Sequence, residues 1–387
     1  MKYSFSEEQL AFRNGLRRFM EDVSPSTEVR RLMESEEGYD KSVWVRLANE
    51  LGITGIHIPE AYGGQGFGVS ELGIVLEEAG RALICAPIFS STVLAATAVM
   101  KAGTEEQKQR LLPGLAAGKV RAALAWVEPG HSWLPEDCKC IAREVADVTT
   151  IHGSKSLVVD GHEADAFVVL ARTPDCEADA GLSLFWVEGN ADGIERRLQQ
   201  SLDPTRKLAN LHFDGVFAER LGSLNAGFRA LNETLDVAAV CLAHEMAGGA
   251  ERLLESAVDY ANLRYQFGRP IGSFQSLKHK AADMVVDVEL AKSAAYYSAA
   301  SLDAGDGDAS IAASAAKVQA SESYMRTAAH TVQIHGGIGF TWDNDTHLWY
   351  KRAKSSEVFL GSPAFHRAKL MDRWEENQWA DWGIQDD

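Results

Sequence analysis

The spacing of apolar residues divides the chain into three segments. In residues 1–118, apolar side chains recur every three or four positions, which is the period of an amphipathic helix. In residues 119–228 the pattern changes to short runs rich in Val, Ile, Leu and Phe, such as 166–170 and 182–187, bounded by Gly, Asp, Asn or Pro. Runs of this kind are typical of strands in an antiparallel sheet or barrel. In residues 229–387 the helical period returns and persists.

The last segment carries the strongest helical pattern. One apolar stripe runs through Leu231, Leu242 and Leu253, and Ala-rich stretches at 291–300 and 311–320 allow helices to pack closely. We therefore expect an α+β, mainly α fold. It consists of an N-terminal helical domain, a middle antiparallel β-domain and a C-terminal helical bundle.

The composition is that of a folded globular protein. The 387 residues, of which 46% are hydrophobic, are enough for more than one core. The 55 acidic residues outnumber the 38 basic ones, and the net charge of -17 disfavours unspecific binding to nucleic acid or anionic lipid. The start lacks the apolar core of a signal peptide, and no stretch reaches the roughly 20 apolar residues that span a bilayer. We expect a cytoplasmic protein without a nucleic-acid or membrane partner.

Neither cysteine nor acidic clusters indicate a metal site. The chain has five cysteines: Cys85, Cys138, Cys140, Cys176 and Cys241. Their odd number and scattered positions argue against a disulfide framework. Cys138 and Cys140 have no second Cys or His pair at ligand spacing, so no metal is expected there. Residues 303–308 lack the closing Glu of a calcium loop and are interpreted as a solvated connection between helices.

Two motifs in the last segment carry the strongest signals for a binding site. Residues 264–275 (Arg-Tyr-Gln-Phe-Gly-Arg-Pro-Ile-Gly-Ser-Phe-Gln) end a helix with a cation, turn at Gly and Pro, and begin another helix. Residues 333–340 (Gln-Ile-His-Gly-Gly-Ile-Gly-Phe) contain glycines that let a backbone approach a ligand closely. Taken singly, Arg264 is also consistent with a helix cap, and the glycines with a tight turn. Their order and spacing together make a chance occurrence improbable.

Together these motifs resemble the acyl-CoA dehydrogenase family. The resemblance covers nearly the whole chain, because Trp44 with residues 51–53 and 59–64 is similar to the family's N-terminal signature, and residues 103–113 to the turn before its β-domain. It implies a C-terminal four-helix bundle and an FAD cofactor whose adenine-diphosphate half is reached across a subunit interface. The residues that it assigns to this contact are Arg264, Phe267, Gln275, Gln333, Gly336, Gly337 and Gly339.

The catalytic base is absent from both positions where the resemblance places it. In this family a carboxylate removes the α-proton of an acyl-CoA thioester while the β-hydrogen leaves as hydride to the flavin. Leu360 occupies one base position here and Tyr265 the other. Glu245 and Glu357 are the remaining candidates, but each is more consistent with solvent exposure or a salt bridge. We expect no catalytic residue in this chain.

The segments that resemble the family's flavin-ring site also depart from its pattern. Val127 and Val159 stand where hydroxyl-bearing residues are usual, and Leu157 stands where a flavin-stacking Trp is usual. A valine cannot donate a hydrogen bond to a flavin ring edge or to a phosphate. We therefore expect the ring half of the chain's own site to be dismantled.

The chain keeps the residues assigned to the subunit interface and lacks those assigned to its own flavin ring and base. In this it resembles the degenerate subunit of heteromeric family members, which are associated with bulky acyl-CoAs such as sterol side chains. The resemblance implies an α2β2 complex in which this chain completes the FAD site of a catalytic acyl-CoA dehydrogenase subunit. Arg264 and Gln275 would contact pyrophosphate or adenine, and residues 333–339 the adenylate. The acyl-CoA substrate and an electron-transferring flavoprotein are the other implied partners. Two alternatives stay open: a homomeric enzyme with a relocated base, Glu245 or Glu357, and a flavin-free scaffold protein of the same fold.

Overall fold

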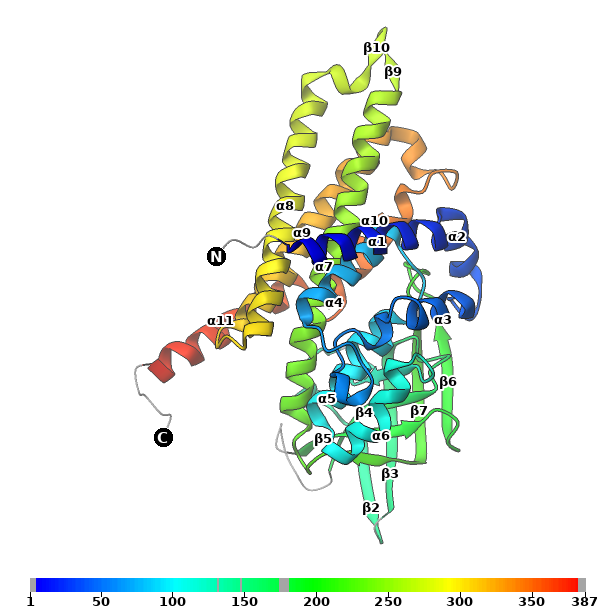
Figure 1. Ribbon diagram of the computed structural model, residues 1–387, viewed down its shortest axis with the longest axis vertical. Coiled ribbons are helices and arrows are strands. Elements are labelled where there is room, and N and C mark those ends of the chain that lie inside the picture. The colour runs from blue at the N-terminus through cyan, green and yellow to red at the C-terminus, as the bar shows by residue number, and fades with distance from the viewer. Residues whose placement is uncertain (1–4, 131, 147, 174–180, 382–387) are drawn as a thin grey trace. The chain divides into compact units, whose positions relative to one another are not determined.

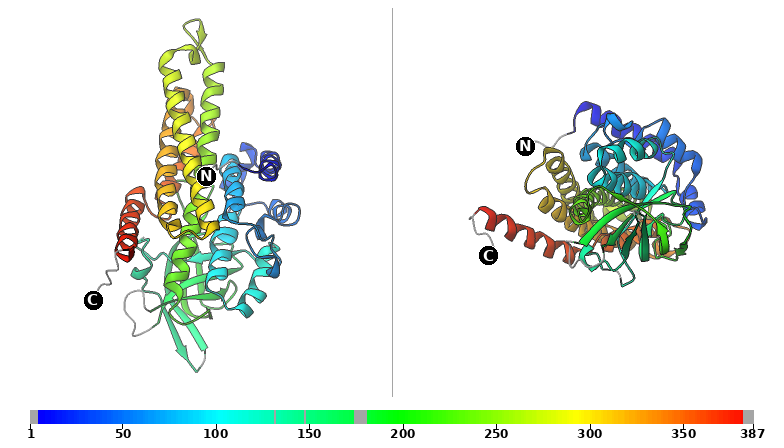
Figure 2. Two further views of the ribbon diagram at one scale, coloured as in Figure 1. Left: turned by 60° about the vertical axis from the view of Figure 1, so that its left-hand side comes forward. Right: turned by 90° about the horizontal axis from the view of Figure 1, so that it is seen from below.

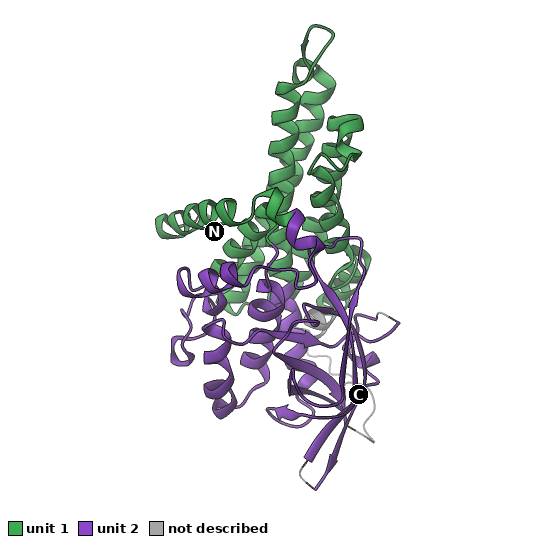
Figure 3. Ribbon diagram, turned by 90° about the vertical axis from the view of Figure 1, so that its right-hand side faces the viewer, with its two compact units in different colours: residues 1–29, 69–84, 239–387 green, residues 30–68, 85–238 purple. Residues whose placement is uncertain are grey.

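A computed structural model describes residues 5–130, 132–146, 148–173 and 181–381. The chain forms two compact units (Figure 3). Unit 1 contains residues 1–29, 69–84 and 239–387, and unit 2 contains residues 30–68 and 85–238. The division falls within helices α2 (Ser26–Glu34) and α7 (Gly227–Leu263), so each of them begins in one unit and ends in the other. Cys176 lies outside the described residues.

Unit 1 is helical. Besides parts of α2 and α7, its helices are α1 (Glu7–Val23), α4 (Val69–Ala82), α8 (Gln275–Ala304), α9 (Ala309–His335), α10 (Thr346–Val358) and α11 (Pro363–Asp381). α7, α8 and α9 run side by side (Figures 1 and 2), and they share a buried cluster of Val240, Ala299 and Ala313. Small side chains at this contact let the helix backbones approach closely. The C-terminal bundle expected from the helical period is confirmed. No helix in the described part of the chain is both long and apolar enough to cross a membrane.

The two motif segments meet at one end of the bundle. After α7 the chain forms a hairpin of β9 (Tyr265–Gln266) and β10 (Arg269–Pro270), visible at the top of Figure 1, and a 3-10 turn η6 (Ile271–Ser273) leads into α8. Phe267 and Gly268 both have positive φ, 53° and 74°, as the two central residues of a tight hairpin turn require. Ile271 packs against a buried cluster that contains Ile334, the second residue of the glycine-rich motif. Tertiary packing thus brings the motifs together.

Helix α1 is held in unit 1 by buried ion pairs. Its first turn is closed by a capping box. Arg13 binds Glu77 (Nη2 to Oε1, 2.6 Å) and Glu78 (Nε to Oε1, 2.9 Å), and both carboxylates are buried. Arg17 binds both oxygens of Glu78, at 2.8 and 2.9 Å. Because loss of either partner would leave an uncompensated buried charge, these pairs fix α1 against α4.

The helices of unit 2 are short. They are α3 (Lys41–Asn49), η1 (Ile53–Gly55), η2 (Glu60–Tyr62), η3 (Ile88–Ala95), α5 (Ala96–Ala102), α6 (Glu105–Ala116) and η4 (Pro135–Asp137). The Asp40 carboxylate caps α3 by accepting the N–H groups of Ser42 and Val43, and Thr104 caps α6 in a capping box with Gln107. η3 is a π-helix whose eight residues are all buried. The helical texture expected for residues 1–118 is therefore confirmed.

The rest of unit 2 is a β-sheet, which is eight-stranded within the described residues. Its strands are β1 (Ala122–Ala125), β2 (Ile141–Val145), β3 (Val148–Val159), β4 (Ala166–Arg172), β5 (Leu182–Glu188), β6 (Ile194–Gln199), β7 (Leu208–Phe217) and β8 (Glu219–Leu221). The order is β6-β7-β3-β2-β4-β5-β8, with β1 beside β4. All pairs are antiparallel except those of β4 with β1 and β2. Nearly every residue of β4 and β5 is buried, as their uninterrupted apolar runs require. The predicted middle β-domain is confirmed.

Candidate functional site

The loop after α10, where the resemblance to the family places a base, carries Leu360. Leu360 is buried, with φ of 62°, and Gly361 follows with φ of 107°. The fully buried ammonium of Lys317 on α9 donates to the last carbonyls of α10, those of Ser356 (3.0 Å) and Glu357 (2.8 Å). Carbonyls in the last turn of a helix lie beyond the regular intrahelical ladder, and Lys317 accordingly donates to these two and fixes the point at which the loop begins.

His366 holds the same loop from the other side. Its Nε2 lies 3.0 Å from the carbonyl oxygen of Leu360 and donates to it. Burial, together with the charges of Lys317, Lys369 and Arg373, lowers the pKa of His366 to about 3. The neutral ring therefore keeps its position over the physiological pH range. The loop is well fixed, but the isobutyl side chain of Leu360 has no ionisable group and so can neither donate nor accept a proton.

The two remaining carboxylate candidates are both in ion pairs. Glu245 on α7 is buried, and its Oε1 lies 3.0 Å from Nη1 of Arg352 on α10. Glu357 pairs with Lys354, one turn away on α10. Tyr265, at the other customary base position, is exposed in the β9–β10 hairpin. These placements agree with the salt-bridge interpretation of Glu245 and Glu357.

The first predicted cofactor-binding segment lies exposed at the end of the bundle. Phe267 is 91% exposed at the hairpin turn, and Arg264 and Gln275 are exposed beside it. Across the described residues, the Arg264 guanidinium forms no hydrogen bond or ion pair. Gln275 begins the 30-residue helix α8, whose N-cap, Phe274, supplies no side-chain cap. The first N–H groups of a long helix and an unpaired guanidinium are both suited to a diphosphate.

The second segment has open space next to it. A Cβ atom added at Gly336 or Gly337 would meet no atom within 4 Å other than those of its neighbours in the chain. Gly336 has φ of 65° and so needs glycine for its backbone, but no such strain applies to Gly337, so this chain's packing alone would accept a larger residue there. Gln333 is exposed, whereas Gly339 is buried, and a Cβ atom added there would lie 3.0 Å from the carbonyl oxygen of Val332. The residues predicted to bind the adenine-diphosphate half of FAD therefore fit such a group.

Unit 2 contains the segments expected to hold a flavin ring. Val127 and Val159 are both buried, at the end of β1 and in β3. The pairing of β3 with β7 shifts between Lys155 and Val158, which forms a bulge, and Leu157 in this bulge has φ of 55°. A bulge takes one side chain out of the alternation of side chains between the two faces of a sheet. The side chain redirected here, that of Leu157, is aliphatic, whereas the resemblance places a tryptophan at this position. The bulged backbone is present, while the aromatic and hydroxyl groups are not.

One buried cluster was missed by the sequence analysis. The ammonium of Lys155 in β3 is fully buried and lies 2.8 Å from Oε1 of Glu128 and 3.4 Å from Sγ of Cys138. Glu128 also accepts the backbone N–H groups of Lys139 and Cys140. Burial raises the pKa of the Cys138 thiol, so it remains protonated. A single lysine in an apolar run was the available signal, but its partner 27 positions away could not be inferred.

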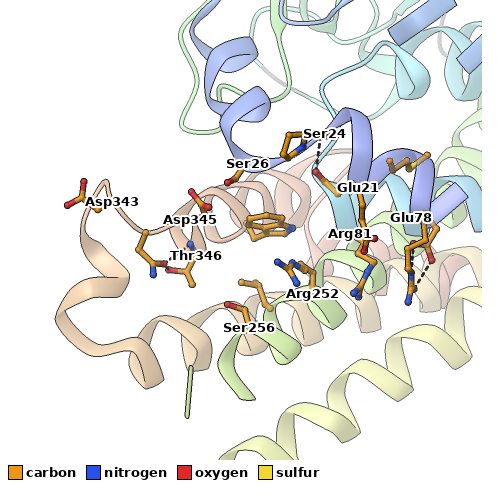
Figure 4. Close-up of a pocket in the computed structure, with 17 residues that line it drawn as sticks. Glu21, Ser24, Ser26, Glu78, Arg81, Arg252, Ser256, Asp343, Asp345 and Thr346 are labelled. Atoms are coloured by element: carbon orange, nitrogen blue, oxygen red, sulfur yellow. Dashed lines mark hydrogen bonds and ion pairs between the residues drawn. The ribbon is translucent and has the colours of Figure 1, made fainter. Parts of the chain in front are cut away.

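A polar pocket of about 430 Å³ also lies in unit 1 (Figure 4). Its charged and hydroxyl-bearing lining includes Arg17, Glu21, Ser24, Ser26, Glu78, Arg81, Arg252, Ser256, Asp343, Asp345 and Thr346. Arg17 binds Glu78, Arg81 binds Glu255 at 2.8 Å, and Nη1 of Arg252 lies 3.8 Å from Oε2 of Glu255, so all three guanidinium groups are paired with carboxylates within the unit. Polar walls of this kind do not suit an acyl chain. Among the described residues that line the pocket, none belongs to the predicted cofactor or base positions.

Comparisons with known proteins agree with this geometry. The family models for the N-terminal and C-terminal domains of acyl-CoA dehydrogenase match residues 6–119 and 225–374. The acyl-CoA dehydrogenase IpdE2 of Mycobacterium tuberculosis is 34% identical over 351 residues, which is 91% of each chain. The structure of the Tcur3481-Tcur3483 steroid ACAD is 31% identical, with a TM-score of 0.87, over 96% of this chain and 99% of that one. Butyryl-CoA dehydrogenase of Megasphaera elsdenii is 28% identical, with a TM-score of 0.89, over 95% and 98%.

These matches extend over both ends of the chain and nearly all of its length, at an identity that reflects common descent. They also agree with the helix–sheet–helix order of the elements. The chain therefore belongs to the acyl-CoA dehydrogenase family.

Proposed function

We propose that this chain is the non-catalytic subunit of an α2β2 acyl-CoA dehydrogenase and completes the FAD site of a catalytic partner subunit. The observation that carries the proposal is the loop at Leu360. Lys317 and His366 fix the backbone of this loop by hydrogen bonds. The position that needs a carboxylate nevertheless carries an aliphatic side chain. In this family, FAD accepts the hydride released from the β-carbon of the thioester. The proton must be removed by a base on another chain.

The exposed end of the bundle supports the second half of the proposal. Packing within the chain does not explain the residue types at three of its positions. Arg264 and Gln275 are exposed, and a Cβ atom added at Gly337 would meet no atom within 4 Å. Phe267 and Tyr265 expose aromatic surface at the same end. Large exposed apolar groups next to unpaired polar ones are typical of a surface that meets another molecule. We infer that this surface meets the FAD held by the partner.

Our proposals for the substrate class and for further partners are supported by the names of similar proteins. One similar structure is a steroid ACAD named for two components, Tcur3481 and Tcur3483. Another is the structure of the electron transferring flavoprotein of Acidaminococcus fermentans, at 30% identity and a TM-score of 0.90. We infer an acyl-CoA thioester of steroid breakdown as substrate and an electron-transferring flavoprotein as acceptor. Cys85, Cys138, Cys140 and Cys241 are free thiols, which is consistent with a reducing, cytoplasmic location.

Co-expression with a catalytic family member encoded near it tests the proposal. Purified alone, the chain is expected to carry no flavin absorbance, and purified with its partner it is expected to give one FAD per pair of subunits. Acyl-CoA should then bleach the flavin of the complex. The homomeric alternative predicts instead that the chain alone binds FAD and is bleached by acyl-CoA, which would overturn the proposal. A complex or a single chain that never takes up flavin would support the scaffold alternative.

Two variants separate cofactor contact from folding. Arg264→Ala and Gly337→Val should weaken FAD binding by the complex about tenfold or more, because each removes a charge-assisted bond or fills the space beside the cofactor. Neither should change the melting temperature of the chain alone, since neither position is packed. Arg229→Ala, an exposed arginine at the other end of α7, and Gly15→Ala on α1 are the matched controls. Equal FAD affinity in variants and controls would remove the assigned contact.

A further inference from the structure

His335, the last residue of α9, stacks on Tyr260 of α7. The ring centroids are 4.4 Å apart and the ring planes differ by 19°. The carbonyl of Tyr260 accepts the backbone N–H of Arg264 at 2.8 Å, and Gly336 follows His335 directly. The stacked pair therefore joins the start of the arginine hairpin to the start of the glycine loop.

The hydrogen bond of His335 decides which ring nitrogen carries the proton. Nδ1 lies 2.9 Å from the carbonyl oxygen of Thr331. A carbonyl oxygen only accepts, so Nδ1 donates, and Nε2 of the neutral ring is then unprotonated. Burial lowers the pKa of His335, which favours the neutral ring at physiological pH.

Nε2 of His335 is an acceptor without a donor. None of the described residues forms a hydrogen bond with it. Some side-chain nitrogens of the chain, such as Nδ1 of His366, are fully enclosed and lack a partner, but Nε2 of His335 is not among them. His335 as a whole is buried, but its Nε2 is not fully enclosed. The open space beside Gly336 and Gly337 lies next to it in the chain. An N–H or O–H donor from another molecule can reach this edge.

We propose that Nε2 of His335 accepts a hydrogen bond from the exocyclic amine of the adenine of FAD and so selects adenine over bases without that donor. The inference rests on the proposed function, which brings FAD to the glycine loop. A nitrogen lone pair in the plane of a stacked ring suits an in-plane N–H of a flat base, as adenine presents. Hypoxanthine carries a carbonyl oxygen at that place, and two facing acceptors form no bond. A ribose hydroxyl is the other donor of the cofactor, and it is unchanged in the hypoxanthine analogue.

The test compares FAD with its hypoxanthine analogue on the complex of the full chain and its catalytic partner. Affinity is measured by titrating each dinucleotide into the flavin-free complex and following flavin fluorescence. We expect FAD to bind about tenfold more tightly than the analogue, the value of one hydrogen bond made or left unmade at a desolvated site. Equal affinity for the two dinucleotides would overturn the adenine assignment and favour a ribose contact.

Two variants make the test specific to Nε2. His335→Gln can place its carbonyl oxygen where Nε2 stands, whereas His335→Asn keeps a donor toward Thr331 but has no acceptor at that reach. The Gln variant should keep most of the preference for FAD over the analogue, and the Asn variant should lose it. A preference that persists in His335→Asn would contradict the inference.

The result also separates this inference from the proposed function. If the wild-type complex binds neither dinucleotide, the proposed function fails and this inference fails with it. If FAD binds and bleaches with acyl-CoA but the analogue binds equally well, the proposed function stands and only the role of His335 is lost.

Discussion

Arg352 of α10 and Glu245 of α7 form a buried ion pair, with 3.0 Å between Nη1 and Oε1. The two residues are 107 positions apart in the sequence. A carboxylate whose oxygen already accepts from a guanidinium is directed at that partner and not at a substrate carbon. The pair therefore ties two helices together and counts against Glu245 as a relocated base.

Replacing Glu245 by Gln should lower the free energy of unfolding by about 3 kcal/mol, because the buried Arg352 then loses the carboxylate with which it pairs. Urea denaturation followed by circular dichroism measures the change. Glu289→Gln, at an exposed position of α8, is the control and should stay within about 0.5 kcal/mol of wild type. A Glu245→Gln complex of wild-type stability that no longer turns over acyl-CoA would instead support the relocated-base alternative.

Lys317→Met should loosen the loop that carries Leu360. Methionine keeps much of the volume but leaves the carbonyls of Ser356 and Glu357 unsatisfied, at a cost of about 3 kcal/mol. Hydrogen exchange should become faster in residues 355–362 than elsewhere in the bundle. Ser321→Ala, which removes a hydroxyl bonded to Lys317 but leaves the ammonium, is the matched control and should have a smaller effect. Unchanged exchange in Lys317→Met would show that the loop is held by other contacts.

Glu128→Gln should destabilise unit 2 by about 3 kcal/mol, since the fully buried Lys155 loses its countercharge. Burial opposes ionisation of Glu128, but Lys155 and the backbone N–H groups outweigh it, so the pKa of Glu128 is lowered. Its contribution is present above the pKa of the unfolded chain and is lost as the pH falls through the lower folded value. Thermal melts at several pH values should show a shallower acid limb for Glu128→Gln, and the exposed Glu136→Gln should not.

Buried histidines should make the chain lose stability in mild acid. The pKa of His366 is lowered from 6.5 to about 3, and those of His57 and His244 to about 4, in each case chiefly by burial. Between these values and 6.5 the unfolded chain binds protons that the folded chain does not, so stability falls as the pH falls below 6.5.

His366→Gln removes one of these titrations and retains an N–H donor for the carbonyl of Leu360. Its stability should therefore fall less steeply than that of wild type between pH 6.5 and pH 4. Urea denaturation across this range measures both slopes. A variant with a slope as steep as that of wild type would show that His366 does not stay neutral in the folded chain.

Much of the architecture could be predicted from local pattern. The change in apolar period near residues 119 and 228 indicated a sheet between helical segments, because period and strand length depend only on near neighbours in the chain. The turn at Phe267 and Gly268 was visible for the same reason. Residues 303–308 are all exposed, as a solvated connection requires. By contrast, one contact of this segment could not be predicted: Asp303 accepts the backbone N–H groups of Val69 and Ser70 and caps α4. That contact depends on helix packing, which no local pattern encodes.

The sequence by itself determined which side chains were available: Leu360 and Tyr265 at the customary base positions, and an arginine and glycines at the nucleotide motifs. Only the tertiary structure decided which of those groups are already engaged within the chain. Ion pairing depends on distances between helices that are far apart in sequence, so the partner of Glu245 could not be inferred from spacing. The stacking of Tyr260 on His335, which leaves one ring nitrogen as an outward acceptor, depends on the same packing.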